Sequence, residues 1–328
     1  MTNTAVVILN FNGEDYLKNF LPSVLQYSGN AEIIVADNKS TDNSIKILKE
    51  EFPSVRLIEL AENYGFAGGY NKALEQVNSE FLILLNSDVE VTENWLTPMI
   101  KFLNDNPSYA ACQPKVKDHK KPEKFEYAGA SGGFIDSLGY PYCRGRIFDT
   151  IEDDKGQYDE PLDIFWAAGA CLVIRNKIFK EVGGLDIDFF AHMEEIDLCW
   201  RIKSLGHKIK AIPDAVIYHV GGGTLSKLSP VKTHLNFRNG LYMLIKNLPI
   251  KNLILKFPLR IFLDWIAVIK FIIEGNGKHG LAVLKAHFDV LFTFNKTLKK
   301  RELFSNPPTK RLVVADYYLR KKRKFDEI

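Results

Sequence analysis

A carboxylate follows a fully apolar run in this chain, at Asn86-Ser87-Asp88. Residues 81–85 read Phe-Leu-Ile-Leu-Leu, and apolar character resumes at Val89. Such a run is typical of a strand that is buried on both faces of a parallel sheet. Because ligands of open α/β sheets bind beyond the carboxyl ends of the strands, Asp88 is a candidate to meet a metal ion or a charged ligand. A simple strand-ending turn would also favour Asn, Ser and Asp at these positions.

A second carboxylate, Asp37, ends the apolar run 33–36 and is followed by Asn38. An acid in this place can accept hydrogen bonds from a ribose hydroxyl or from a base N–H. The residues Ser40, Thr41 and Asp42 can cap the next helix without help from Asp37. Asp37 is therefore left over from the turn, which favours a functional role.

A glycine-rich segment at residues 62–71, Glu-Asn-Tyr-Gly-Phe-Ala-Gly-Gly-Tyr-Asn, follows the third apolar run. Glycines at a helix start let backbone N–H groups approach a ligand closely. The sequence contains neither Gly-x-Gly-x-x-Gly nor Gly-x4-Gly-Lys-Ser/Thr. Close helix packing therefore explains the segment as well as ligand binding does.

Carboxylates and a histidine gather near the end of the first two hundred residues. Glu194, Glu195 and Asp197 lie within four positions, where they would complement the positive end of a helix. Crowded carboxylates also raise one another's pKa, and one of them could then serve as a general base. His219 stands between an apolar run and Gly221-Gly222-Gly223, where a structural role or a metal-ligand role is open.

The elements that must position these residues alternate along the first hundred positions. Strand-like runs are expected at 4–10, 32–37, 55–60 and 81–86, and helix-like segments at 14–27, 41–51, 67–78 and 92–104. This alternation predicts βαβ units and a parallel sheet with right-handed crossovers. Residues 108–165 lack a clear period and predict short strands and loops. Further strands are expected at 163–175, 208–212 and 215–219, and helices at 176–182 and 194–205.

The character of the chain changes beyond residue 224. Residues 231–294 predict long helices, and the apolar run 253–273 carries Lys256, Arg260, Asp264 and Lys270 on one face roughly 120° wide. Pro258 is expected to interrupt the first turn. The charges argue against a spanning helix and favour one that lies in a membrane interface or on a partner. An ordinary amphipathic helix that covers the preceding domain is the alternative. The tail 296–324 is rich in Lys and Arg, which attract anionic lipid or nucleic acid.

Composition describes an ordinary globular chain. It has 328 residues with a net charge of +3, and it is 46% hydrophobic. Its four cysteines lie far apart with no Cys-x-x-Cys pair, which argues against a zinc site or a disulfide scaffold and suits a reducing cytosol. The N-terminus leads straight into a strand-like run, so we expect no secretory signal.

Taken together, six ordered motifs resemble the family 2 glycosyltransferases, especially the rhamnosyltransferase-like branch. They are residues 7–12 (VILNFN), 35–42 (VADNKSTD), 63–71 (NYGFAGGYN), 85–88 (LNSD), 194–198 (EEIDL) and 218–222 (YHVGG). The resemblance covers roughly residues 4–224 and leaves the rest unexplained. It implies a GT-A fold, with residues 1–224 as the nucleotide-sugar-binding and catalytic domain. Residues 225–328 would be a helical, amphipathic extension.

The resemblance also implies roles for individual residues. Asp37 would meet the nucleobase, with the other donor contacts at Asn10, Asn38, Asn63, Gly65, Phe66, Asn71 and Asp88. Asp88 would hold Mg²⁺ or Mn²⁺ against the diphosphate, and His219 would complete that metal site. Glu195 stands where the family usually has Asp as its base, with Glu194 and Asp197 as alternatives. Asn86 replaces the first carboxylate of the family's Asp-x-Asp motif, which leaves one anionic ligand fewer.

The implied activity is an inverting, metal-dependent transfer of a sugar from a nucleoside-diphosphate-sugar to a glycan or lipid-linked acceptor. The sugar would be rhamnose or another hexose, used in cell-surface polysaccharide synthesis. The alternatives are a nucleotidyltransferase and a non-catalytic nucleotide-sugar-binding membrane scaffold. A nucleotidyltransferase would need a basic glycine-rich loop near the N-terminus, whereas residues 10–15 are acidic. We expect a cytoplasmic protein, peripheral on the inner face of the cell membrane, with no nucleic-acid partner.

Overall fold

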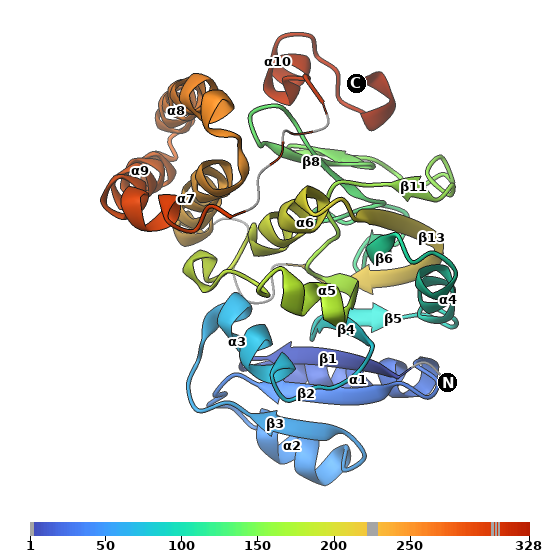
Figure 1. Ribbon diagram of the computed structural model, residues 1–328. Helices are drawn as coiled ribbons and strands as arrows, with labels where there is room; N and C mark the ends of the chain where they lie inside the picture. The colour runs from blue at the N-terminus through green and yellow to red at the C-terminus, as the bar shows by residue number, and fades with distance from the viewer. Residues whose placement is uncertain (1–2, 222–228, 303–304, 306, 308) are drawn as a thin grey trace.

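The fold is built on one large sheet with helices on both faces (Figure 1). The computed structural model describes residues 3–221, 229–302, 305, 307 and 309–328. Within these residues the sheet has nine strands, in the order β11-β13-β6-β12-β4-β1-β2-β3, with β5 paired to β13. The expected α/β class, a mostly parallel sheet flanked by helices with a helical C-terminal extension, is confirmed.

The first half of the sheet is parallel, as predicted. Its strands are β1 (Thr4–Asn10), β2 (Glu32–Asp37), β3 (Arg56–Glu59) and β4 (Phe81–Asn86). The helices between and after them are α1 (Glu14–Tyr27), α2 (Ser44–Glu51), α3 (Gly65–Leu74) and α4 (Thr97–Asp105). Two helices begin later than expected. The turn after Asp37 delays α2, and the short strand β5 (Val89–Val91), which pairs with β13, delays α4.

The second half of the sheet differs more from the prediction. It contains β6 (Tyr109–Asp118), β11 (Leu162–Asp163), β12 (Cys171–Arg175) and β13 (Lys208–His219). The strand β6 was missed because it is buried on both faces yet carries Gln113 and Lys115, so it shows no alternation. Both polar side chains are satisfied internally, since Gln113 Oε1 accepts from the Ala168 N–H and Lys115 pairs with Asp154.

Two other predicted strands also change. The expected strands 208–212 and 215–219 form one strand, β13, with a register shift between Ile212 and Val216. The expected strand 163–175 is broken, with Asp163 at the end of β11 and only residues 171–175 forming β12. A small second sheet consists of β7 (Gly133–Ile135), β8 (Pro141–Cys143), β9 (Arg146–Ile147) and β10 (Thr150–Ile151). The helices α5 (Asn176–Glu181) and α6 (Glu194–Ser204) and the 3₁₀ turn η1 (Ile187–Phe189) cover the face of the large sheet that α3 covers.

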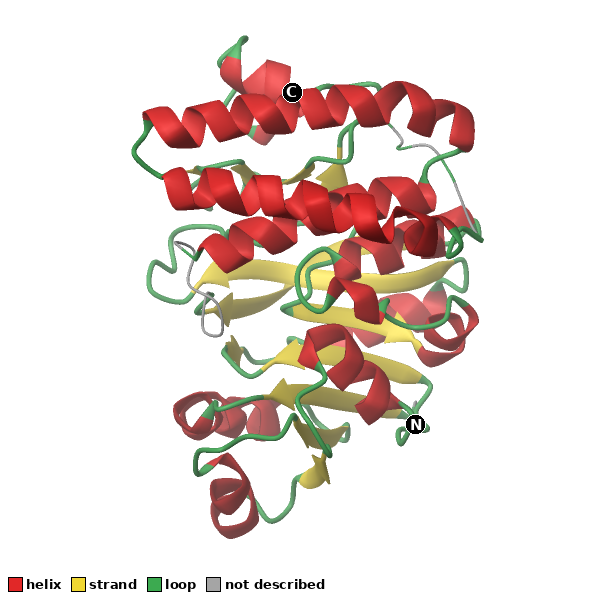
Figure 2. Cartoon of the chain, turned by 90° about the vertical axis from the view of Figure 1, so that its left-hand side faces the viewer, coloured by secondary structure: helices red, strands yellow, loops and turns green. Residues whose placement is uncertain are grey.

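Three long helices follow, α7 (Pro230–Asn247), α8 (Ile250–Ile273) and α9 (Gly277–Leu298), and then the short α10 (Val313–Tyr318). Figures 1 and 2 show α8 and α9 on the outside, with α7 between them and the rest of the molecule. The core of the large sheet continues into α7 through Leu241, Leu244 and Ile245, which are fully buried. The expected boundary at 224/225 falls outside the described residues, as do Gly222 and Gly223.

The helix α8 corrects one expectation and shows where its charged stripe lies. It continues through Pro258 instead of being interrupted there. Its charged stripe is turned inward, since Arg260 and Asp264 are buried and paired with each other at 3.0 Å. No helix in the described part of the chain is both long and apolar enough to cross a bilayer.

The four cysteines, Cys112, Cys143, Cys171 and Cys199, are free and buried. Burial raises the pKa of each thiol above its ordinary value. These side chains therefore act as small apolar core residues.

Candidate active site

The carboxyl ends of β1, β2 and β4 bring Asn10, Asp37 and Asn86 to one edge of the sheet. Asn10 Nδ2 donates to Asp37 Oδ2 over 3.1 Å, and the Ser40 N–H donates to Asp37 Oδ1 over 2.8 Å. Asp37 is thus not left over from the turn, as its sequence context indicated, but is part of it. Its carboxylate retains lone pairs for a further donor. Asn10 Oδ1 is buried and has no hydrogen-bond partner among the described residues.

The second predicted residue of this turn, Asn38, holds the glycine-rich loop. Its Nδ2 donates to Asn63 Oδ1 and to the Gly65 carbonyl, each over 3.0 Å, and its Oδ1 accepts from the Tyr64 N–H. Asn63 in turn accepts from the Gly65 N–H over 2.9 Å. Both side chains therefore shape the loop, and Asn63 is also exposed.

The glycine-rich loop packs against the segment that leads to α6. Gly65 has a φ of +68°, and a Cβ at this position would lie 2.5 Å from the Phe190 ring. The N–H groups of Phe66 and Ala67 both donate to the Phe190 carbonyl, over 2.8 and 3.3 Å. These N–H groups are therefore occupied, and the start of α3 does not offer them to a ligand as the glycines indicated.

The predicted donor contact Asn71 is also used internally. Its Nδ2 donates to the Leu185 carbonyl over 2.7 Å, and its Oδ1 accepts from the Leu185 N–H over 3.0 Å. The reciprocal pair fixes α3 to the segment 185–190. We infer that Asn71 positions this segment and does not contact the donor directly.

Asp88 and His219 meet at the end of β4, as the sequence predicted. His219 Nε2 lies 3.1 Å from Asp88 Oδ1, and His219 Nδ1 lies 3.5 Å from Glu126 Oε1. All three side chains are buried. Burial alone would raise the pKa of Asp88, but the hydrogen bond and the charge of His219 hold it below its usual value. Burial would lower the pKa of His219, yet Asp88 and Glu126 raise it to about 10.

The residues at this corner fit a divalent cation that is shared with a substrate. No group of three or more His, Cys, Asp or Glu side chains is arranged to hold a metal ion within the described ranges. Mg²⁺ in phosphate-transfer sites, however, is usually bound by one or two carboxylates together with substrate phosphates and waters. Glu126 beside Nδ1 would orient the His219 ring, and Nε2, which faces Asp88, would bind the cation in place of its proton. Glu126 carried no signal in the sequence, because β6 and the chain after it were read as loops.

The three candidate bases at the start of α6 differ in their burial, hydrogen-bond partners and pKa. Asp197 is fully buried and accepts hydrogen bonds from Arg201, Lys246 and Asn247. Burial would raise the pKa of Asp197, but the charges of Arg201 and Lys246 and these hydrogen bonds lower it below its usual value. Asp197 therefore ties α6 to α7, and its carboxylate is already engaged by three side chains.

Glu194 and Glu195 differ from Asp197 because each has a buried Oε2 without a hydrogen-bond partner in the described structure. Burial, assisted by the charge of Glu195, raises the pKa of Glu194 well above its usual value. Burial raises the pKa of Glu195 to about 7, against backbone N–H groups that lower it. Glu194 is buried as a whole residue, whereas Glu195 is partly exposed. Only Glu195 combines access with a pKa near neutrality.

Gly169 brings Glu195 close to the Asp88 corner. A Cβ on Gly169 would lie 3.7 Å from both the Glu195 carboxyl carbon and the Phe66 ring. The next residue, Ala170, accepts a hydrogen bond from the Asn86 N–H over 3.0 Å. Glu195, Phe66 and the end of β4 are therefore neighbours in one site.

Sequence reasoning missed the residue that holds the loop before Glu195. Asn239, fully buried on α7, donates through Nδ2 to the carbonyls of Phe189, Ala191 and His192, over 3.0, 2.9 and 2.7 Å. The loop needs this support because Phe190, His192 and Met193 all have φ between 63° and 72°. Asn239 lies outside every motif, so no sequence signal identified it.

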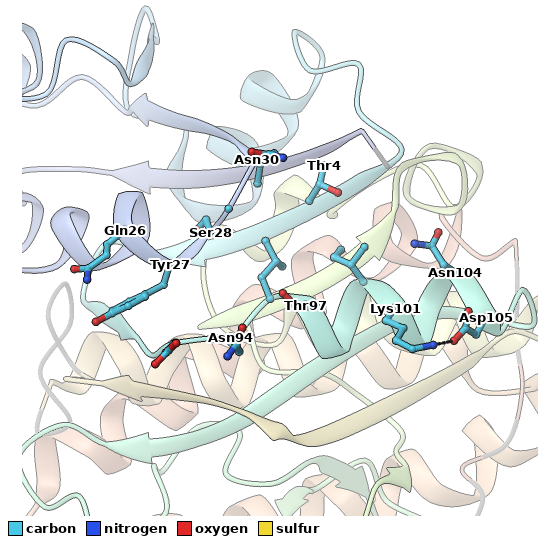
Figure 3. A pocket seen from close by; sticks show the side chains of 15 residues that line it. Thr4, Gln26, Tyr27, Ser28, Asn30, Asn94, Thr97, Lys101, Asn104 and Asp105 are labelled. Carbon is cyan, nitrogen blue, oxygen red and sulfur yellow. Dashed lines mark hydrogen bonds and ion pairs between the residues drawn. The ribbon is translucent and has the colours of Figure 1, made fainter. Parts of the chain in front are cut away.

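A surface cavity of about 780 Å³ lies elsewhere, between α1 and α4 (Figure 3). It is lined by Thr4, Tyr27, Ser28 and Thr97, among others. Thr4 begins β1 and Asn10 ends it, so this cavity lies at the opposite end of the strand from the site. It includes none of the predicted site residues.

Comparison with known proteins decides between the classes considered above. Residues 5–183 match the family model of Glycosyl transferase family 2. The chain belongs to this family. It is therefore a glycosyltransferase that takes its sugar from a nucleotide-sugar, and the nucleotidyltransferase and the non-catalytic scaffold are set aside.

Relatives of this family 2 glycosyltransferase include rhamnosyltransferases. It is 25% identical over 233 residues to the N-acetylglucosaminyl-diphospho-decaprenol L-rhamnosyltransferase of Mycobacterium tuberculosis, covering 65% of this chain and 75% of the relative. It is 23% identical over 215 residues to rhamnosyltransferase WbbL of Escherichia coli, covering 63% of this chain and 80% of the relative. Among solved structures, GalNAc-T7 with UDP, GalNAc and Mn²⁺ matches with a TM-score of 0.59 and 17% identity, over 74% of this chain and 48% of that chain. The expected GT-A fold is confirmed.

Proposed function

We propose that this enzyme transfers the sugar with inversion of configuration at the anomeric carbon and that Glu195 is its general base. The acceptor hydroxyl would attack the anomeric carbon in line while Glu195 takes its proton. The observation that supports this most is a partly exposed residue whose carboxylate has a buried, unpartnered Oε2 and a pKa raised to about 7. A base tuned to neutral pH contributes about 10²–10⁴-fold to the rate.

We propose that Asp37 and Asn10 receive the nucleobase and ribose of the donor. Asp37 has free lone pairs, and Asn10 has a buried Oδ1 without a partner in the described structure. Asn38, Asn63, Gly65 and Asn71 would act indirectly, by holding the loop and the segment 185–190 in place. Phe66 lies beside Glu195 and would pack against the sugar.

We propose that Asp88 and His219 hold Mg²⁺ or Mn²⁺ together with the donor's diphosphate. When bound, the cation would neutralise charge on the departing diphosphate, an effect on the order of several kcal/mol. The solved structure of GalNAc-T7 with UDP, GalNAc and Mn²⁺ supports a divalent cation in this fold. The chain's own contribution is the buried carboxylate of Asp88, which stays ionised because its pKa is lowered.

We propose that the sugar is rhamnose or another hexose and that the acceptor is a glycan or a lipid-linked glycan of cell-surface polysaccharide synthesis. The name of the mycobacterial relative, whose acceptor is a decaprenol-linked sugar, supports this. Such an acceptor would place the enzyme in the cytoplasm, peripheral on the inner face of the cell membrane. A screen of nucleotide-sugars that measures nucleotide release would identify the donor.

The base assignment is tested by exchanging each glutamate for its neutral isostere. We expect Glu195→Gln to lose about 10²-fold or more in turnover while donor affinity stays the same. Glu194→Gln is the matched control, because a residue with a strongly raised pKa is already neutral and should tolerate the exchange. Turnover of Glu195→Gln at the wild-type rate would refute the assignment.

The metal assignment is tested by calorimetry of donor binding with and without Mn²⁺. We expect the cation to strengthen donor binding by the wild-type enzyme and to have no effect on Asp88→Asn. His219→Ala should weaken the cation effect, and Glu126→Gln should weaken it less. Equal responses of wild-type and Asp88→Asn to Mn²⁺ would refute the assignment.

A further inference from the structure

The outer face of α8 is apolar along nearly its whole length. Every residue from Ile254 to Ile273 that is exposed is apolar, including Leu255, Phe262 and Trp265. The charged residues of this stretch face the other way. Arg260 and Asp264 are buried, and Lys256 and Lys270 are partly buried. An exposed apolar surface of this extent on a folded domain marks an interaction site.

The inward charges of α8 are satisfied by the protein itself. Arg260 Nη1 donates to the Leu138 carbonyl over 3.2 Å, and its guanidinium lies 3.9 Å from the Tyr140 ring centre. Asp264 accepts from Arg260 and Tyr140 and lies 3.3 Å from His287 of α9. This buried network fixes the rotation of α8 about its axis. The apolar face is therefore turned outward by the fold and is not a consequence of a loosely attached helix.

The neighbouring helices extend the apolar face. Leu281, Phe288 and Phe292 are exposed along α9, which packs beside α8. At the far end of α8, Lys270 Nζ lies 3.4 Å from the hydroxyl of Tyr318, and the next residue, Leu319, is 80% exposed. In Figure 2 the helices α8 and α9 run across the same side of the molecule. We call this combined surface of α8, α9 and Leu319 the apolar face.

Basic side chains accompany the apolar face. Lys251 and Lys278 are exposed at the first turns of α8 and α9, and Lys285 is exposed between Leu281 and Phe288. Arg320 and Lys321 are exposed directly after Leu319. The exposed acid Glu274 lies 3.7 Å from Lys270. Cations around an apolar surface match the anionic headgroups and the acyl chains of a lipid bilayer.

We propose that the apolar face docks this enzyme on an anionic membrane surface, with α8 and α9 lying flat in the interface. A second copy of the chain is a poorer occupant, because a two-fold contact would bury the exposed Lys285 among apolar side chains such as Leu281 and Phe288. On a membrane, the same lysine can extend to the headgroups. This docking rests on the proposed function in one respect, since it would bring the enzyme to a lipid-linked acceptor. The helix α7 packs against α8 and α9 and also carries Asn239, so the docked helices lie one helix away from the loop before Glu195.

The test is flotation of the full chain with vesicles of equal parts phosphatidylcholine and phosphatidylglycerol. We expect the wild-type protein to float and a Leu255→Ser/Phe262→Ser variant to lose at least about tenfold in vesicle affinity. Val231→Ser is the matched control, since Val231 is 57% exposed on α7 and lies outside the apolar face. Absence of flotation by the wild-type protein would refute the proposal, as would equal flotation of the double variant.

The protein carries its own probe of this docking. Trp95, Trp166 and Trp200 are buried, while Trp265 is 49% exposed on the apolar face. We expect vesicles to shift tryptophan emission to shorter wavelength and brominated lipid to quench it. Unquenched emission would refute insertion. A concentration-dependent dimer that forms without lipid and is abolished by Leu255→Ser/Phe262→Ser would also overturn the proposal, in favour of a second copy.

Donor hydrolysis in lipid-free solution separates this inference from the proposed function. We expect the double variant to release nucleotide at the wild-type rate, which also shows that it is folded. An enzyme that releases nucleotide but ignores vesicles would overturn the docking alone. An enzyme that binds vesicles through Trp265 but lacks transferase activity with every donor would overturn the proposed function and leave the docking supported.

Discussion

At the scale of single residues, Glu194 and Glu195 have identical side chains but differ in exposure and in pKa. They are adjacent at the start of α6, but only Glu195 is partly exposed. Burial raises the pKa of both, and that of Glu195 reaches about 7. A carboxyl with a raised pKa is protonated below that value, so it cannot accept a proton there. The reaction should therefore require a pH above the pKa of Glu195.

This gives a pH prediction for the wild-type enzyme. We expect kcat to rise about tenfold per pH unit below about pH 7 and to level off above it. The same rising limb should persist in Glu194→Gln and vanish from the residual activity of Glu195→Gln. Nucleotide release measured at saturating donor across the range would check this. A limb that persists unchanged in Glu195→Gln would assign it to another group.

A second prediction concerns the contact between Gly65 and the Phe190 ring, and Gly29 provides a control for it. Gly65 and Gly29 both have positive φ, +68° and +58°, so alanine strains both to a similar degree. A Cβ at Gly65 would also meet the Phe190 ring, whereas nothing lies within 4 Å of a Cβ at Gly29. We expect Gly29→Ala to cost about 1 kcal/mol of unfolding free energy, and Gly65→Ala about 1–3 kcal/mol more. Urea denaturation would measure both, and equal losses would contradict the packing argument.

At the scale of elements, the loop before Glu195 depends on a helix outside the family match. Asn239 of α7 donates to three carbonyls of this loop, all of them next to or within its left-handed residues. The geometry of the base is thus set by the C-terminal helices. Family 2 similarity ends at residue 183 in the matched range and would not reveal this dependence.

We therefore expect Asn239→Asp, which keeps the shape but removes the N–H donors, to lower kcat by about 10–10²-fold. Donor affinity should change little, because the proposed donor residues Asn10, Asp37 and Asp88 lie at or just beyond the ends of β1, β2 and β4. Asn295→Asp, an exposed position on α9, is the matched control. Steady-state kinetics with calorimetric donor binding would separate the two effects. A loss of donor affinity equal to the loss of kcat would indicate general unfolding instead of mispositioning.

The elements also show what sequence could and could not predict. The runs 4–10, 32–37 and 81–86 were found because both faces of these strands are buried and apolar. The strand β6 was not found, because Gln113 and Lys115 interrupt its apolar residues and are satisfied by partners far along the chain. The resemblance to family 2 glycosyltransferases is what paired Asp88 with His219, and their side chains lie 3.1 Å apart in the structure. Glu126 and Asn239 were missed because only tertiary contacts give them a role.

At the scale of the whole molecule, the C-terminal helices belong to the same core as the sheet. Leu241, Met243, Leu244 and Ile245 of α7 are fully buried in it. Each such side chain stabilises the fold by about 1.5–3 kcal/mol, and net stabilities are about 5–15 kcal/mol. We expect a chain that ends at residue 224 to be insoluble or unfolded by circular dichroism, with the full-length chain as control. A folded, donor-binding fragment would show that the two regions are independent domains.

The burial of Cys112, Cys143, Cys171 and Cys199 has a practical consequence for testing all of this. Thiol reagents attack the thiolate, and these thiols are both inaccessible and held protonated by burial. A cysteine introduced at an exposed position, such as Phe292→Cys on α9, would thus be the single site of maleimide labelling in the folded enzyme. Spin labels or fluorophores could then report on one chosen position at a time while every native cysteine stays in place.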